Sequence, residues 1–115
     1  MLNFKIRIYI CPNQSITIQP NLVKVDEGWA AGTSLLNEIN MMPNNPNFMC
    51  YNKQFLLSKS SPEKVIFDVL VLSVRNIKKA IIPNFIEVIK DYAFAGCMDL
   101  ESVEFQPDSK LRQIE

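Results

Sequence analysis

The 115-residue chain contains no histidine, and this absence removes the commonest general base and the commonest metal ligand of proteins. Its three cysteines, Cys11, Cys50 and Cys97, lie far apart and form no C-x-x-C pair. Such spacing favours neither a zinc site nor a dense disulfide framework. We expect all three to be small buried thiols, and the sequence predicts no metal and no cofactor.

A surplus of either charge is also absent, because twelve basic residues balance twelve acidic ones. A chain with neither a basic surplus nor a long charge run is not expected to bind nucleic acid or anionic lipid. The apolar run VLVLSV is far too short to span a bilayer, so membrane insertion is not predicted. The opening MLNFKIRIYIC is interrupted by Lys5 and Arg7, and it alternates as a strand does, unlike a signal peptide.

Sequence signatures of catalysis are missing, since the chain has no G-x-S-x-G, P-loop, H-E-x-x-H or dinucleotide-binding pattern. Two carboxylate pairs, Asp26 with Glu27 and Glu101 with Glu104, are most simply solvated polar faces, because no partner base accompanies them. The sequence therefore predicts that the protein is not an enzyme. A hydrolase would need a deep pocket that joins Asp26 and Glu27 to a polar partner.

Three further features each allow a functional and a plain structural interpretation. The N-I-K-K cluster at 76–79 could bind phosphate or lipid, although lysines that flank a buried strand usually serve solubility. Trp29 could stack on a sugar, although corner packing is the commoner role for such a residue. Asn13 heads a formal N-glycosylation sequon, and its expected inward position argues against modification.

The chain does contain an internal repeat of its apolar positions. Two pairs of segments share one spacing: a 23-residue step separates the members of each pair, and a 64-residue shift carries the first pair onto the second. The four sets are Asn13/Ile16/Ile18, Leu36/Ile39/Met41, Ile77/Ala80/Ile82 and Leu100/Val103/Phe105. A 23-residue step falls within the range of leucine-rich repeats, roughly 20 to 29 residues.

This spacing predicts one short strand for each repeat. No single repeat can bury its apolar face, so neighbouring repeats are expected to stack as coils and bury these faces against one another. In the copy at 100–105, Leu100, Val103 and Phe105 are expected to point inward. We accordingly expect Val103→Asp to unfold the carboxy-terminal turns and Glu104→Lys to leave stability nearly unchanged. The step between the two pairs is longer than the step within each pair, which predicts an insertion at about 47–74.

The segment 82–105 resembles the BspA-type leucine-rich repeat, whose pattern is approximately I-P-x-x-V-x-x-I-x-x-x-A-F-x-x-C-x-x-L-x-x-V-x-F. The matching residues are Ile82, Pro83, Ile86, Ile89, Ala93, Phe94, Cys97, Leu100, Val103 and Phe105. The earlier copy at 17–41 is degenerate, and 111–114 resembles the opening of a further copy. The inserted NPNFMCYNKQFLLS resembles the hairpin insertion of the protist members of this family.

The stretch DYAFAGC, residues 91–97, is predicted to form the corner of the repeat. Tyr92 and Phe94 would supply bulk where the strand side meets the back of the coil. Gly96 would permit the tight bend, because glycine accepts positive φ at little cost. Cys97 would fill a small inward gap, and Pro83 would help to end the preceding strand.

The predicted fold is mainly β: a short right-handed leucine-rich-repeat solenoid of roughly four turns, with one parallel strand per turn and an inserted β-hairpin. Residues 1–115 are expected to form a single domain. The chain starts inside one 64-residue unit and stops inside a repeat, and it has no visible capping helix. We therefore expect a fragment of a longer array whose open ends could self-associate.

The resemblance implies a non-enzymatic protein-recognition or adhesion module that binds host surface or extracellular matrix proteins. The strand face would contact the partner through Glu101, Ser102, Glu104 and Lys79. The family also implies a cell-surface or secreted location, although no signal peptide or anchor is visible, which leaves a cytoplasmic location open. The alternative interpretation is a truncated or intracellular repeat scaffold with no ligand of its own.

Overall fold

A computed structural model describes the chain at residues 8–10, 15–25 and 36–115, with side chains for the second and third of these ranges. These residues form ten strands and no helix. The strands are β1 (Ile8–Ile10), β2 (Ser15–Ile18), β3 (Glu38–Met41), β4 (Phe48–Tyr51), β5 (Phe55–Ser58), β6 (Val69–Ser73), β7 (Lys79–Ile82), β8 (Val88–Ile89), β9 (Ser102–Phe105) and β10 (Gln113–Ile114). The mainly β class is confirmed.

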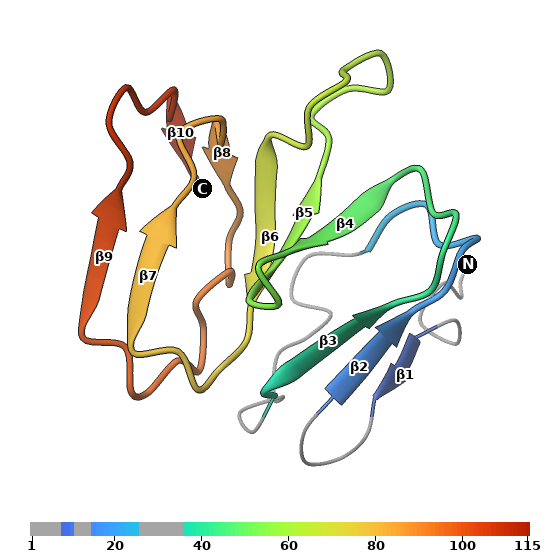
Figure 1. The fold of residues 1–115 in the computed structure, drawn as a ribbon, viewed down its shortest axis with the longest axis horizontal. Coiled ribbons are helices and arrows are strands. Elements are labelled where there is room, and N and C mark those ends of the chain that lie inside the picture. Colours follow the sequence, from blue (N-terminus) through green and yellow to red (C-terminus); the bar gives the residue numbers. More distant parts are fainter. Residues whose placement is uncertain (1–7, 11–14, 26–35) are drawn as a thin grey trace.

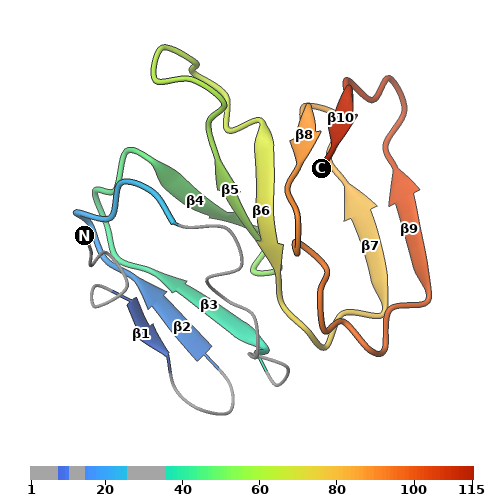
Figure 2. The same cartoon turned by 180° about the vertical axis from the view of Figure 1, so that it is seen from behind.

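The strands form three sheets, with the orders β1-β2-β3, β10-β8-β6-β5-β4 and β7-β9. Beyond β6 the chain runs one way along β7 and β9 and returns along β8 and β10, so that successive coils stack (Figure 1). The view from behind shows the same arrangement, with β7 and β9 side by side (Figure 2). The short β-solenoid of stacked coils that the sequence predicted is therefore confirmed.

The 23-residue step appears directly in the strand register. In the first parallel pair, β2 and β3, Ile16 lies opposite Ile39. In the second parallel pair, β7 and β9, Ile82 lies opposite Phe105. The same step along the chain separates the partners in both pairs, which confirms the repeat that the apolar spacing predicted.

Each coil of the carboxy-terminal stack also carries a second, shorter strand, in addition to the one that the sequence predicted. The strands β6, β8 and β10 are parallel neighbours, with Val69 opposite Val88 and Val88 opposite Gln113. The first of these two steps along the chain is shorter than the β7–β9 step, and the second is longer. The corner loops therefore absorb the differences in length between coils.

The predicted β-hairpin is formed by β4 and β5, which are antiparallel neighbours. Its turn residues Asn52 and Lys53 have φ values of 57° and 59°. Two consecutive positive φ values are typical of a type I′ turn, and the amide of Gln54 closes this turn by donating to the carbonyl of Tyr51 at 3.0 Å. The hairpin pairs through β5 with β6, also antiparallel, so the segment 47–74 contains the hairpin and the first strand of the parallel stack.

The core is one contiguous cluster that joins the β2–β3 pair, the hairpin and the carboxy-terminal coils. Alternation explains which residues enter it, since successive side chains of a strand point to opposite faces. On β7, Ala80 and Ile82 are fully buried while Lys79 and Ile81 are exposed. The fully buried large side chains of the cluster include Ile16, Ile18, Leu22, Phe55, Leu56, Leu57, Leu70, Ile82 and Ile86.

The inward placement predicted for β9 is only partly correct. Leu100 packs against the core, but Val103 is 42% exposed and Phe105 is 45% exposed. The physical reason is that β9 pairs only with β7 among the described strands. The coil of β7 therefore packs on one side of Val103 and Phe105, and no described coil covers them on the other side. The expectation that Val103→Asp would bury an unpaired charge is therefore wrong for this structure.

The corner at 91–97 confirms the glycine prediction and corrects the one for Tyr92. Gly96 has a φ of 80°, as the tight bend requires. Phe94 packs edge-on against Phe55, with ring centroids 6.3 Å apart. Tyr92 is 55% exposed and has a φ of 66°, so it turns the chain and adds no buried bulk.

Two of the three cysteines lie within the described residues, and both are half-buried free thiols. The thiol of Cys97 donates to the carbonyl of Val74 at 3.5 Å, which places it in the inward gap predicted for it. Burial raises the pKa of Cys97 and that of Cys50. Both thiols are therefore suited to packing and poorly suited to nucleophilic chemistry. Cys11 lies outside the described residues.

Candidate functional site

The outward face of β7 and β9 carries most of the contact residues predicted from the sequence. Lys79 lies opposite Ser102, and Ile81 lies opposite Glu104. All four side chains are exposed, and we call this surface the strand face. Glu101 is also exposed, but it precedes β9 and stands outside its alternation.

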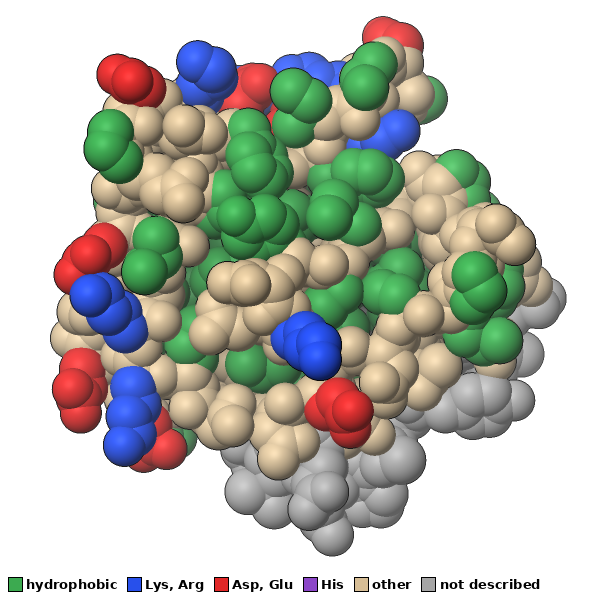
Figure 3. All heavy atoms as spheres, in the orientation of Figure 1, with side chains coloured by type: hydrophobic (Ala, Val, Ile, Leu, Met, Phe, Trp, Pro, Cys, Tyr) green, Lys and Arg blue, Asp and Glu red, His purple; other side chains and the backbone are tan. Residues whose placement is uncertain are grey.

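The charged residues of the strand face neutralise one another. Lys79 Nζ lies 3.2 Å from Glu104 Oε2, across the diagonal between the two strands. Their side chains are about half exposed, and an exposed pair of this kind contributes less than about 1 kcal/mol to stability. Acidic and basic side chains follow the edge of the molecule that carries β7 and β9 (Figure 3). The face is therefore a mixed polar surface and not the acidic patch that Glu101 and Glu104 alone would make.

Ile81 is a candidate contact that the sequence reasoning missed. Its side chain is 46% exposed and lies between two charged neighbours, Lys79 and Glu104. Interfaces bury apolar side chains at their centre inside a polar rim, and this arrangement has that form. Alternation along K-A-I-I, residues 79–82, could have revealed it. Ile81 lies two residues after Lys79 and therefore on the same outward face of the strand, whereas Ala80 and Ile82 lie on the inward face.

The backbone of the strand face is held rigidly at both ends of β9. The amide of Glu101 donates to the carbonyl of Lys78 at 2.8 Å, before the strand begins. The amide of Gln106 donates to the carbonyl of Ile82 at 3.1 Å, after the strand ends. The ladder between these bonds fixes the spacing of the outward side chains, so a partner would meet a preformed array.

Ion pairs join the coils on the other side of the stack. Glu87 is bound by Lys64 Nζ at 2.8 Å and by Arg112 Nε at 3.1 Å. The hydrogen bonds that Lys64 and Arg112 donate to Glu87 lower the pKa of Glu87. The hydrogen bonds that Lys64 donates to Glu87 and Asp68 raise the pKa of Lys64. A separate pair joins Lys90 and Glu115 at 2.9 Å. These contacts are structural, because they connect successive coils.

Asp68 is the buried acidic residue of this network, with a side chain 1% exposed. Burial alone raises the pKa of Asp68, but hydrogen bonds from the hydroxyl and amide of Ser60 and from Lys64 outweigh it, and the pKa is lowered overall. The two Ser60 bonds measure 2.6 and 2.8 Å. The carboxylate is thus saturated with donors and has a structural role.

Arg75 is a second buried ionisable residue, and it supports the corner at 91–97. Its guanidinium is buried and donates to the carbonyls of Ser73 at 3.3 Å and Ala93 at 3.2 Å. Burial lowers the pKa of Arg75. Bonds to Ala93 fix the start of the bend that carries Gly96 and Cys97.

Several residues considered from the sequence lie outside the described parts of the chain, namely Asn13, Asp26, Glu27 and Trp29. The hydrolase pocket that would require Asp26 and Glu27 therefore stays an untested hypothesis. The lysines of N-I-K-K do lie at a concave surface. Lys78 and Lys79 line an open polar cleft of about 340 Å³ with Lys53 and three asparagines.

Two features do not occur among the residues that are described, namely a clustered metal site and a membrane-spanning helix. Among these residues, no group of three or more His, Cys, Asp or Glu residues is arranged to hold a metal ion. In the same residues, no helix has the length and apolar character needed to cross a membrane.

Comparison with protein families identifies the carboxy-terminal coils. Residues 64–115 match the family described as the BspA type leucine rich repeat region (6 copies). The matched segment contains β6 to β10, and therefore the whole strand face, the corner at 91–97 and the ion pairs between coils. Neither the curated proteins nor the solved structures include a match to the chain.

Proposed function

Residues 64–115 belong to the BspA-type leucine-rich repeat family, a repeat-based protein-interaction module, and from this premise we propose that the chain is an adhesion module. Its partner is a host surface or extracellular matrix protein, and its place is the cell surface or the extracellular space. Leucine-rich repeats generally serve as non-enzymatic binding scaffolds, and in our proposal the chain has no catalytic activity of its own.

The observation that carries the proposal is the exposed Ile81 on a rigid strand face. When a partner covers a large apolar side chain that has 46% of its area in water, the free energy of the complex is lowered. Lys79 and Ser102 beside it offer hydrogen-bond donors, and Glu104 offers an acceptor. A central apolar contact with polar neighbours can therefore provide both affinity and orientation.

The proposal is tested by biolayer interferometry with the chain immobilised and extracellular matrix proteins in solution. We expect Ile81→Asp to weaken binding at least about tenfold, because the substitution places a charge at the centre of the interface. The matched control is Ile66→Asp, since Ile66 is 54% exposed and lies in the loop between β5 and β6. Circular dichroism establishes that both variants are folded.

Two outcomes contradict the proposal. Equal binding by the wild type and by both variants would mean that the strand face is not the contact surface. Failure to bind any matrix or host surface protein, together with a cytoplasmic location of the native protein, would favour the repeat scaffold without a ligand.

A further inference from the structure

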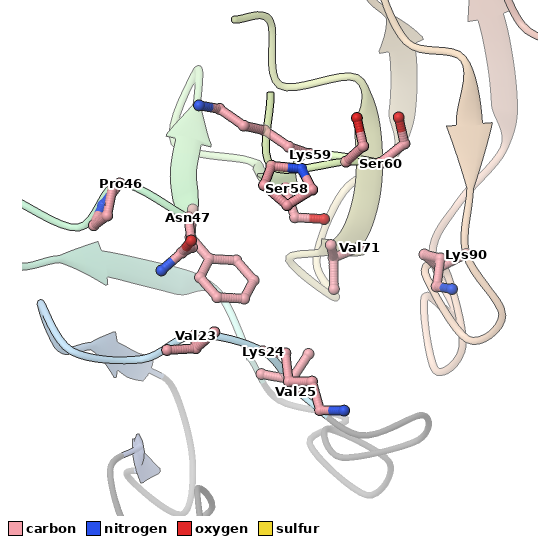
Figure 4. Close-up of a pocket in the computed structure, with 13 residues that line it drawn as sticks. Val23, Lys24, Val25, Pro46, Asn47, Ser58, Lys59, Ser60, Val71 and Lys90 are labelled. Carbon is pink, nitrogen blue, oxygen red and sulfur yellow. The ribbon is translucent and has the colours of Figure 1, made fainter. Parts of the chain in front are cut away.

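A second concave surface lies away from the strand face, and we call it the lysine cleft. It is an open cavity of about 400 Å³ between residues 23–25, the start of β4, the end of β5 with its following loop, and the middle of β6. Lys24, Lys59 and Lys90 lie on three different sides of it, and the Lys59 side chain extends away from Val71 (Figure 4). Sites for small ligands and peptide side chains typically measure roughly 300 to 1,000 Å³, so the size is sufficient.

The charge of the lysine cleft is of one sign. Among the described residues, three lysines line it and no acidic residue does, although the chain as a whole is neutral. Lys59 Nζ stands 4.8 Å from the centre of the Phe67 ring, and Lys90 is paired with Glu115. Glu115 offsets the charge of Lys90, so Lys24 and Lys59 are the lining residues whose charge attracts an anion to this concave surface.

The floor of the lysine cleft is apolar. Phe48, at the start of β4, and Val71, in the middle of β6, both line it. Val71 is the one half-buried residue of β6, whose other four residues are buried, and it packs against the core while it also lines the cleft. Asn47 and Ser58 stand at the side of this floor, where their side chains can meet the peptide groups of a ligand.

One wall of the cleft is fixed by two asparagines. The side-chain amide of Asn45 donates to the carbonyls of Gln19 at 2.7 Å and Leu22 at 3.1 Å. Asn47 donates to the same Leu22 carbonyl at 3.2 Å. These bonds hold the start of β4 against the segment that leads to residues 23–25.

The opposite wall is fixed by Asp68. Its carboxylate accepts hydrogen bonds from the amide and hydroxyl of Ser60, which anchors the loop after β5 to the start of β6. The same carboxylate is paired with Lys64 at 3.2 Å, and it is not among the lining residues. The cleft is therefore preformed, and ordering its walls costs little on binding.

From this geometry we propose that the lysine cleft binds a short acidic peptide segment of a partner protein. The carboxylates of the segment lie beside Lys24 and Lys59, and one apolar side chain covers Phe48 and Val71. A peptide fits better than an anionic membrane, because the lysines surround a recessed floor instead of reaching one plane. The site is independent of the strand face and does not rest on the function proposed for it.

Fluorescence polarisation with the labelled peptide EELDE tests the proposal, and its uncharged isostere QQLNQ is the second probe. We expect EELDE to bind and QQLNQ to bind at least about tenfold more weakly, since each lysine loses its charged partner. Lys24→Glu and Lys59→Glu should each weaken binding of EELDE at least about fivefold. The matched control is Lys110→Glu, because Lys110 is exposed and lies outside the cleft.

Three results overturn the inference. These are equal affinity for EELDE and QQLNQ, equal losses in Lys24→Glu and Lys110→Glu, and absence of EELDE binding by the wild type. Vesicles of phosphatidylcholine with phosphatidylserine are tested in parallel. Binding to the vesicles without binding to EELDE would mean that the lysines contact an anionic membrane and not a peptide. Ile81→Asp should bind EELDE as the wild type does, which separates failure of this site from failure of the strand face.

Discussion

Two of the parallel strand pairs, β2–β3 and β7–β9, share one 23-residue register and differ in their surroundings. Residues 39 and 103 are equivalent under the 64-residue shift, and each lies opposite a fully buried residue, Ile16 and Ala80. Ile39 is 7% exposed, whereas Val103 is 42% exposed. The same position of the repeat is thus part of the core in one pair and part of the surface in the other.

The difference teaches that a coil can be attached in two ways. The β2–β3 pair is held through buried apolar side chains of both strands. The carboxy-terminal coils add ion pairs, and all five that occur among the described residues lie within 64–115. Three of these join residues at one common separation along the chain, namely Lys79 with Glu104, Glu87 with Arg112 and Lys90 with Glu115.

The largest expected effect comes from the same substitution at the two equivalent positions. Ile39→Asp should destabilise the fold by more than about 4 kcal/mol, because it places an unpaired carboxylate in the core. Val103→Asp should cost about 1 kcal/mol or less, since water reaches that side chain. Urea melts followed by circular dichroism measure both. Equal losses would mean that the two pairs have the same environment, and the comparison would fail.

A smaller loss is expected from the carboxylate that anchors the carboxy-terminal coils. Asp68→Asn should destabilise the protein by about 1 to 3 kcal/mol, because an amide cannot accept the Ser60 and Lys64 bonds together. The control is Asp108→Asn, at an exposed position whose side chain has no hydrogen bond or ion pair among the described contacts. Thermal melts should show a lower midpoint only for the first variant.

The dependence of stability on pH sharpens the distinction between the two modes of attachment. The folded pKa values of Asp68 and Glu87 lie below their ordinary values of 3.8 and 4.5, so their contribution is present above these values. It is lost as the pH falls through the folded pKa values. Lys64 has a raised pKa, so its contribution is complete below 10.5 and is lost as the pH rises through the folded value.

Urea melts at a series of pH values should therefore show stability falling in acid below about pH 4 and again in strong base. The acid loss should be smaller in Asp68→Asn, which lacks one of the two carboxylates. A pH profile identical in that variant and the wild type would contradict the role given to Asp68.

The smallest effect is expected at the exposed ion pair of the strand face. Glu104→Gln should change stability by less than about 0.5 kcal/mol, because both side chains are about half exposed. The same variant tests the proposed function, since loss of the acceptor should alter partner binding more than folding. A melting midpoint that falls as far as in Asp68→Asn would show that this pair holds the coil.

The repeat itself could be predicted from the sequence, because burial imposes the spacing of apolar residues. Ile16, Ile39 and Ile82 were identified by their register and all three are buried. The insertion was predicted from the extra residues between the two pairs, its hairpin form from the resemblance to the family, and the role of Gly96 from the bend that it permits. Each of these features is local or depends on a fixed step along the chain.

The exposure of Val103 and Phe105 could not be predicted in this way. Their apolar pattern equals that of a buried strand, and only the position of β9 in the stack decides whether another coil covers it. The lysine cleft could not be predicted from the sequence for a related reason. Lys24, Lys59 and Lys90 are far apart in the chain, and no spacing rule connects them.

The antiparallel hairpin gives the solenoid a polarity. Because β5 occupies one edge of β6, a further coil cannot pair with β6 on that side, whereas the outer edges of β9 and β10 remain open among the described strands. In the sheet β10-β8-β6-β5-β4, parallel coils therefore stack on only one side of β6, and the repeat copies that precede the hairpin lie in the separate sheet β1-β2-β3. An inserted pair of strands thus sets the side of β6 on which parallel coils stack.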